Sequence, residues 1–237
     1  MREILKTAYL CSLTKENSMS QSNGGHKSVK TDQYSHHDYY KVDDLLSEEH
    51  LMARDAVQQW VKSEVSPIIE DYANRAACPT HLFKGLAEIG AFGPSLPTEY
   101  GGGGMDEIAY GVIMQELERG DSGIRSMASV QGSLVMFPIY KFGSEEQRKK
   151  YLPKLGNGDF IGCFGLTEPD FGSNPSGMAT NVVDDGDSYI LNGSKMWITN
   201  SPVADLAVVW AKDEQGEILG MIVEKDSKGF SAPEIHG

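Results

Sequence analysis

The sequence contains little cysteine, and the cysteines it has show no pattern that indicates chemistry. Only three occur in 237 residues, Cys11, Cys78 and Cys163, with neither a CxxC pair nor an even spacing. A structural zinc site or a disulfide scaffold needs several thiols in a defined pattern. We therefore expect no metal site and no disulfide framework, and a chain that folds in a reducing compartment.

Basic residues and long apolar runs are also scarce. The chain has 21 Lys and Arg against 34 Asp and Glu, a net charge of −13, and the basic residues are not clustered. So acidic a surface repels a phosphate backbone. Apolar runs such as 204–211 fall far short of the roughly 20 residues that cross a bilayer. With 40% hydrophobic residues, we expect a globular, soluble protein that binds neither nucleic acid nor membrane.

Several common catalytic motifs are missing as well. The sequence has no Walker A loop, no HExxH and no GxSxG, and no strand leads into Gly101–Gly104 at the spacing of a dinucleotide fingerprint. We interpret that glycine run as a turn. Residues 1–41 are polar and rich in Ser, Lys and His, which predicts a disordered leader.

Apolar periodicity predicts a helical domain over residues 42–156. A stripe that includes Val57, Val61 and Val65 recurs at helical spacing, and Ser144 with Gln147 forms an S-x-x-Q capping box. The predicted helices are 46–68 with a bend at Pro67, 81–90 ending in a glycine cap, 106–119, 122–142, and one that begins after Ser144 and runs through Tyr151.

Alternating and β-branched residues predict a second domain of strands over residues 157–237. Asn192-Gly193 is typical of a two-residue hairpin turn, because both residues tolerate positive φ. Since helices come first and strands second, we predict an α+β fold with separate layers. The predicted strands are 161–166, 180–183, 189–191, 196–199, 206–211 and 219–223.

Two segments carry side chains that suit a planar, phosphorylated ligand. Phe164–Ser173 (FGLTEPDFGS) opens from a strand into a Gly-Ser loop, where backbone N–H groups and hydroxyls can meet a polar ring edge or a diphosphate. Trp197-Ile198-Thr199 places a flat aromatic beside a hydroxyl. Taken alone, the first segment is more typical of an ordinary turn and the second of a core strand.

Three motifs in this order resemble the acyl-CoA dehydrogenase family: 142–153 (FGSEEQRKKYLP), 164–178 (FGLTEPDFGSNPSGM) and 191–206 (LNGSKMWITNSPVADL). The resemblance covers residues 42–237. It implies a helical domain followed by an incomplete β-barrel or sandwich domain, with FAD bound where the two meet. The implied cofactor-binding residues are Phe164, Gly165, Leu166, Thr167, Gly172, Ser173, Trp197, Ile198 and Thr199.

Within that family, residues 118–126 (ERGDSGIRS) and 129–136 (SVQGSLVM) resemble the glutaryl-CoA dehydrogenase branch. The resemblance implies that Arg125, with Ser126 beside it, faces the distal carboxylate of glutaryl-CoA, and that Ser173 also reaches the CoA substrate. A guanidinium can bind a carboxylate through two parallel hydrogen bonds. Without the resemblance, Arg125 would be interpreted as a solvated helix residue.

The family's catalytic base is a glutamate in a C-terminal helical domain, and no carboxylate of this sequence matches it, so we assign no catalytic residue. The predicted activity is FAD-dependent α,β-dehydrogenation of an acyl-CoA, with oxidative decarboxylation of glutaryl-CoA to crotonyl-CoA as the specific reaction. A non-catalytic relic that binds flavin or acyl-CoA and an acyl-CoA oxidase-like relative are the alternatives. The family further implies electron-transfer flavoprotein as acceptor, a homotetramer, and a cytoplasmic or mitochondrial-matrix location.

Overall fold

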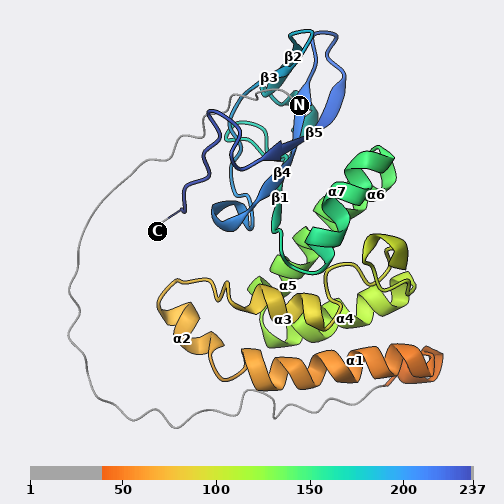
Figure 1. The fold of residues 1–237 in the computed structure, drawn as a ribbon. Coiled ribbons are helices and arrows are strands. Elements are labelled where there is room, and N and C mark those ends of the chain that lie inside the picture. The colour runs from red at the N-terminus through yellow and green to blue at the C-terminus, as the bar shows by residue number, and fades with distance from the viewer. Residues whose placement is uncertain (1–38, 236–237) are drawn as a thin grey trace, which may run out of the picture.

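The computed structural model describes residues 39–235, and Figure 1 shows a lower layer of helices beneath a small twisted sheet. All but the last three positions of the leader predicted for residues 1–41 lie outside the described residues. Among residues 39–235, no helix is long and apolar enough to span a membrane.

The helical domain follows the predicted pattern closely. Ser144 caps α7 through a reciprocal pair of hydrogen bonds with Gln147, as the predicted capping box requires, and Ser47 caps α1 in the same way with His50. The chain turns between the first two helices around Pro67. The helices are α1 (Glu48–Trp60), continued by a π-helical segment (Val61–Val65), α2 (Ile69–Asn74), α3 (Leu82–Glu88), α4 (Glu107–Gly120), α5 (Ser122–Ser129), α6 (Phe137–Phe142) and α7 (Glu145–Gly156).

The helix predicted over 122–142 forms, but its middle is widened. A π-helical segment, Val130–Met136, joins α5 to α6. Gly132 lies in this segment, where a Cβ atom would come within 2.7 Å of the Phe92 carbonyl oxygen. The glycine therefore permits a close backbone approach, and the wider turn shifts the side chains that follow α5 onto a different face.

Five strands form one mixed sheet in the order β1-β4-β2-β3, with β5 on the other edge of β4. β1 runs parallel to β4, whereas β5 is antiparallel to β4 along its whole length. The sheet does not close on itself within the described residues. The strands are β1 (Gly162–Gly165), β2 (Asn181–Asp184), β3 (Tyr189–Asn192), β4 (Leu206–Lys212) and β5 (Ile218–Glu224).

Two of the strand-domain predictions are wrong. Residues 196–199 do not form a strand, because Trp197 adopts a left-handed backbone with φ 61°, which no ladder accommodates. Asn192-Gly193 does not form the hairpin turn either. The chain turns between β2 and β3 at residues 185–188, where Gly186 has φ 78° and the Asp184 side chain accepts the Gly186 N–H.

The two faces of the sheet contact different apolar clusters. The face that carries Leu206 and Val208 packs against the helices and belongs to the large helical core, as does the π-helical segment 130–136. The opposite face has its own smaller cluster, which includes Cys163, Leu191 and Val209. The helical core thus continues directly into the sheet, and both faces of β4 are buried.

Candidate functional site

The two motif segments predicted to bind a cofactor lie against each other. The Met196 N–H donates to the Thr167 carbonyl oxygen at 2.9 Å, which joins the loop after β1 to the loop that replaces the expected strand. Segments almost 30 residues apart in sequence therefore form one continuous surface. That surface brings together the Thr167 and Trp197 regions, as the resemblance implies.

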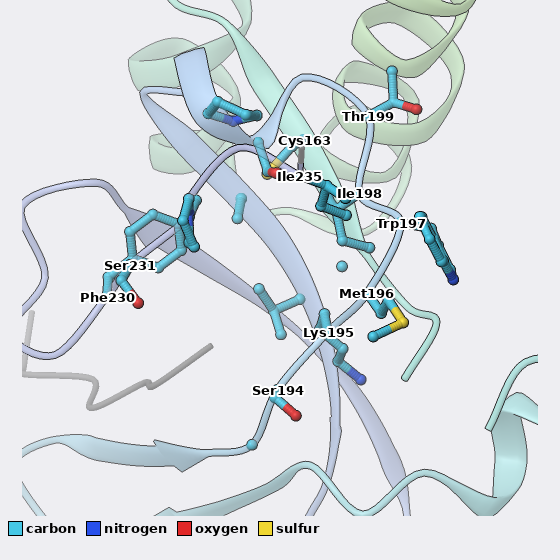
Figure 2. A pocket seen from close by; sticks show the side chains of 18 residues that line it. Cys163, Ser194, Lys195, Met196, Trp197, Ile198, Thr199, Phe230, Ser231 and Ile235 are labelled. Atoms are coloured by element: carbon cyan, nitrogen blue, oxygen red, sulfur yellow. The ribbon is translucent and has the colours of Figure 1, made fainter. Parts of the chain in front are cut away.

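Trp197 is the most exposed aromatic of this surface. Its side chain is 70% exposed, and Figure 2 shows the indole turned away from the strands while Ile198 extends towards them. The positive φ costs a non-glycine residue about 1–2 kcal/mol, so surrounding contacts must hold this conformation. Thr199, Gly172 and Ser173 are exposed as well. A flat aromatic face and several hydroxyls are thus available to a ligand.

A cavity of about 420 Å³ lies beside this surface. It is lined by the face of the sheet that carries Cys163 and Val209, by the loop 193–199 and by the segment 230–235, as Figure 2 shows. Gly165 and the Trp197–Thr199 segment border it, but the remaining predicted cofactor residues do not. Phe164 instead packs edge-on against Trp210, with ring centroids 6.0 Å apart. The apolar cavity and the exposed polar surface are therefore neighbours rather than one site.

Sequence reasoning missed a buried ion pair beneath that surface. The Lys195 ammonium lies 2.8 Å from the Glu168 carboxylate, and each side chain is only 4% exposed. Burial alone would raise the pKa of Glu168, but hydrogen bonds from Lys195, Thr180 and two backbone N–H groups lower it to about 2. Both residues lie inside the recognised motifs, but their neighbours in sequence are largely polar, so no local signal indicates that the two charges meet.

Arg125 lies on α5 within a polar cluster. Its Nε donates to Glu118 at 2.6 Å, and its Nη1 donates to the Ser129 hydroxyl at 3.2 Å. Ser122 also donates to Glu118, and the hydrogen bonds from Ser122 and Arg125 lower the pKa of that carboxyl. The guanidinium is thereby held in a fixed orientation on the half-exposed face of the helix.

The serine whose hydroxyl contacts Arg125 is Ser129. Ser126 is adjacent in sequence, but its side chain makes none of the contacts described for Arg125, and its carbonyl accepts a bond from Ser129. Helical geometry places residues four apart on one face, so the spacing of Arg125 and Ser129 would have identified this neighbour. The contact between Arg125 and Glu118, near the end of α4, could not be identified from the sequence. It forms because the chain turns at Asp121, between α4 and α5.

Buried amides connect the Arg125 helix to the Trp197 loop. Asn200 donates to the carbonyl oxygens of Met127 and Gly162, each at 3.3 Å. Gln131 is fully buried and accepts the Gly162 N–H at 2.8 Å. The start of β1 is therefore held from the helical side and the loop side together, and the spacing between Arg125 and the Trp197–Thr199 loop follows from these bonds.

No group of three or more potential metal ligands occurs in the part of the chain that the structure describes. The donor set is instead one of hydroxyls, amides, a guanidinium and an exposed aromatic. Such groups suit an organic ligand that carries a planar ring and acidic groups.

Both domains are similar to those of known proteins. Residues 47–159 match the model of the acyl-CoA dehydrogenase N-terminal domain, and residues 163–237 match that of the middle domain. A glutaryl-CoA dehydrogenase from Mycobacterium smegmatis, solved in complex with FADH2, is 48% identical, with a TM-score of 0.81 over 83% of this chain and 50% of that one. A glutaryl-CoA dehydrogenase solved as its glutaryl-CoA complex is 34% identical, with a TM-score of 0.73 over 76% of this chain and 47% of that one.

The rat mitochondrial short-chain specific acyl-CoA dehydrogenase is 36% identical over 187 residues, which are 79% of this chain and 43% of the relative. The chain spans about half the length of the curated relatives it matches. The solved relatives confirm the predicted α+β fold of acyl-CoA dehydrogenase type, a helical domain followed by a β-domain, which is an open, mixed sheet within the described residues. Because the two domain models together match most of the residues, the protein belongs to the acyl-CoA dehydrogenase family.

Proposed function

We propose that this chain forms the FAD-facing and acyl-facing wall of an acyl-CoA dehydrogenase whose substrate is glutaryl-CoA. The observation that carries the proposal is the Arg125 cluster, since the guanidinium is held by Glu118 and Ser129 on the helix that Asn200 ties to the Trp197 loop. A cation at this place suits an acyl chain that ends in a carboxylate. The glutaryl-CoA dehydrogenase neighbours support the same choice.

The surface residues fit the cofactor that these relatives bind. Trp197 offers an exposed flat face for the isoalloxazine ring, and the exposed Thr199 hydroxyl can donate to a ring atom. A Cβ atom added at Gly172 would meet nothing within 4 Å beyond its chain neighbours, so a phosphate can approach this backbone, with the Ser173 hydroxyl beside it. When bound, FAD would supply the acceptor for the hydride removed from the β-carbon of the acyl group.

The residues of this chain then have binding and orienting roles. Phe164, Gly165 and Leu166 lead into Thr167, which we place near the pyrimidine edge of the flavin. Arg125 and Ser129 orient the distal carboxylate, and the segment Trp197–Thr199 borders the ring. We assign the catalytic base to no carboxylate of this chain. Removal of the α proton and the electron transfer onward, to an electron-transfer flavoprotein, involve groups for which this chain offers no candidate.

The domain division at residues 41 and 156, the homotetramer and the cytoplasmic or mitochondrial-matrix location belong to the same proposal. Glutaryl-CoA oxidation with decarboxylation to crotonyl-CoA is the reaction proposed for the whole enzyme. An oxidase-like relative differs in passing its electrons to oxygen, so oxygen consumption during glutaryl-CoA turnover would favour that alternative.

Binding experiments with the purified chain test the proposal without requiring turnover. We expect the chain to bind FAD, seen as a perturbed flavin absorption spectrum, and to bind glutaryl-CoA more tightly than butyryl-CoA by calorimetry. Arg125→Ala should weaken glutaryl-CoA binding roughly 10- to 100-fold, the worth of one charged hydrogen-bonded contact, and leave butyryl-CoA unchanged.

Arg75→Ala is the matched control, because Arg75 is an equally long cation in an exposed ion pair with Asp71, 2.6 Å away on α2. It should change neither affinity. Equal losses for both thioesters in Arg125→Ala would remove Arg125 as the selector. Absence of any flavin or thioester binding would instead favour the non-catalytic relic.

A further inference from the structure

The Glu168–Lys195 pair is buried deeply enough to need a specific explanation. Both side chains are 4% exposed, and removing two charges from water costs several kcal/mol per ion unless each is fully paired. Apolar residues of similar volume would fill the same space without that cost. The pair must therefore be judged by what its hydrogen bonds hold in place.

The Lys195 ammonium bridges two points of the loop after β1. It donates to the Glu168 carboxylate at 2.8 Å and to the Leu166 carbonyl oxygen at 3.1 Å. These two acceptors flank Thr167, whose own carbonyl accepts the Met196 N–H. Three successive residues of one loop are therefore bound by two successive residues of the other.

The Glu168 carboxylate extends the same connection to a third segment. It accepts the Ala179 N–H at 2.7 Å, the Thr180 N–H at 3.0 Å and the Thr180 hydroxyl. With the bond from Lys195, the carboxylate accepts four hydrogen bonds, three of them at Oε1. The approach to β2 is fixed to the same point, so the ion pair joins three stretches of chain beneath the exposed surface.

We propose that Glu168 and Lys195 act as positioning residues, a buried clamp that sets the Thr167 loop against the Trp197 loop and so shapes the cofactor surface. This inference rests on the proposed function for its ligand. Neither residue reaches the ligand itself, because both side chains lie beneath the surface. The clamp also explains how Trp197 keeps its left-handed backbone. The two residues before it are both held, Met196 through its N–H and Lys195 through its side chain.

Three variants separate a clamp from a merely stabilising pair: Glu168→Gln, Lys195→Met and the double variant. Each single change leaves a buried charge with fewer partners and lowers thermal stability, whereas the double variant has no buried charge and regains stability. The Glu168–Lys195 ion pair that joins the two loops, however, is absent in all three. We therefore expect flavin affinity to fall roughly 10-fold or more in every variant and to stay low in the double variant.

Two local readouts accompany the affinity. Hydrogen exchange at the Met196 amide reports the bond to Thr167 with or without flavin, and its protection should fall about 10-fold in all three variants while the β4–β5 ladder stays protected. The visible circular dichroism of bound FAD should change as well, because the ring is held differently. Lys150→Met, which removes the half-exposed pair with Glu224, is the matched control and should leave both readouts unchanged.

Recovery of wild-type Met196 protection and flavin affinity in the double variant would overturn the clamp and leave a purely stabilising pair. Wild-type protection in Lys195→Met would overturn it too. If the unaltered chain binds no FAD, the proposed function fails, but Met196 exchange still decides whether the clamp exists. Reduced Met196 protection in all three variants, together with FAD binding by the unaltered chain, would support both the clamp and the proposed function.

Discussion

Replacing Gln131 tests how the helical domain is joined to the sheet. Its side chain is fully buried, donates to the carbonyl oxygens of Leu155 and Phe160 at 2.9 and 2.8 Å, and accepts the Gly162 N–H. Gln131→Met keeps the volume and removes all three bonds. The Leu155 oxygen retains the Gly158 N–H at 3.3 Å, whereas Phe160 and Gly162 lose their side-chain partner.

The expected cost follows from those two backbone groups. An orphaned buried donor or acceptor costs about 1–3 kcal/mol, and the added apolar burial of methionine offsets roughly 1 kcal/mol. We expect Gln131→Met to lower the free energy of unfolding by about 3 kcal/mol. With an m value of roughly 2 kcal/mol/M, the urea midpoint should fall by about 1.5 M.

Urea unfolding followed by far-ultraviolet circular dichroism and by tryptophan fluorescence measures this change, and coincident curves show that both domains unfold together. Gln58→Met is the matched control, because the Gln58 side chain donates to Glu116 at 3.4 Å and accepts from Lys62 at 3.1 Å in more exposed surroundings, so its loss should cost about 0.5 kcal/mol or less. If Gln131→Met lowered the free energy of unfolding by less than about 1 kcal/mol, the hydrogen bonds of this amide would not be what joins the helical domain to the sheet.

The remaining predictions concern single sites. The folded-state pKa of Glu168, about 2, lies below its ordinary value of 4.5, so its contribution of about 3 kcal/mol is present above pH 4.5 and is lost as the pH falls towards 2. Urea midpoints at pH 3 and pH 6 should therefore differ more in the unaltered chain than in Glu168→Gln, and equal differences would contradict the assignment. Ser144→Ala removes the α7 cap, whose hydroxyl accepts the Gln147 N–H at 3.2 Å, and should cost about 1 kcal/mol in the same assay, whereas an unchanged midpoint would show the cap to be unimportant. Trp197→Gly should raise stability by about 1 kcal/mol because glycine adopts the positive φ without strain, yet flavin affinity should fall, and a loss of stability would mean that the indole packs more than its exposure indicates.

The helical domain could be predicted from sequence because its signals are local. The cap at Ser144, the apolar stripe of α1 and the glycine after α3 each act within a few residues. The π-helical widening at Val130–Met136 has no comparable local signal, and Gly132 within it closely approaches Phe92, which lies far away in sequence. Local propensity determines where these helices lie, and tertiary contact determines their finer shape.

The site was predictable only in part. The exposed positions, Trp197 and Thr199 among them, belong to recognisable motifs, but the buried residues that hold them come from contacts across long sequence separations. Glu168 meets Thr180 and Lys195 only after the chain has folded back. The hairpin prediction at Asn192-Gly193 failed for a related reason. A Cβ on Gly193 would come within 2.3 Å of the Thr180 hydroxyl, so this glycine serves a close approach rather than a turn.

The segment Lys195–Asn200 explains why a strand-like sequence does not become a strand. Lys195 binds the Thr167 loop at one end, and Asn200 binds α5 and β1 at the other. Both anchors are buried, whereas Trp197 and Thr199 between them are exposed. A strand would use its backbone N–H and C=O groups in hydrogen bonds to a neighbouring strand. Anchoring the segment by its ends leaves Trp197 and Thr199 free to face a ligand while Ile198 packs towards the sheet, and the strained φ of Trp197 accompanies that arrangement.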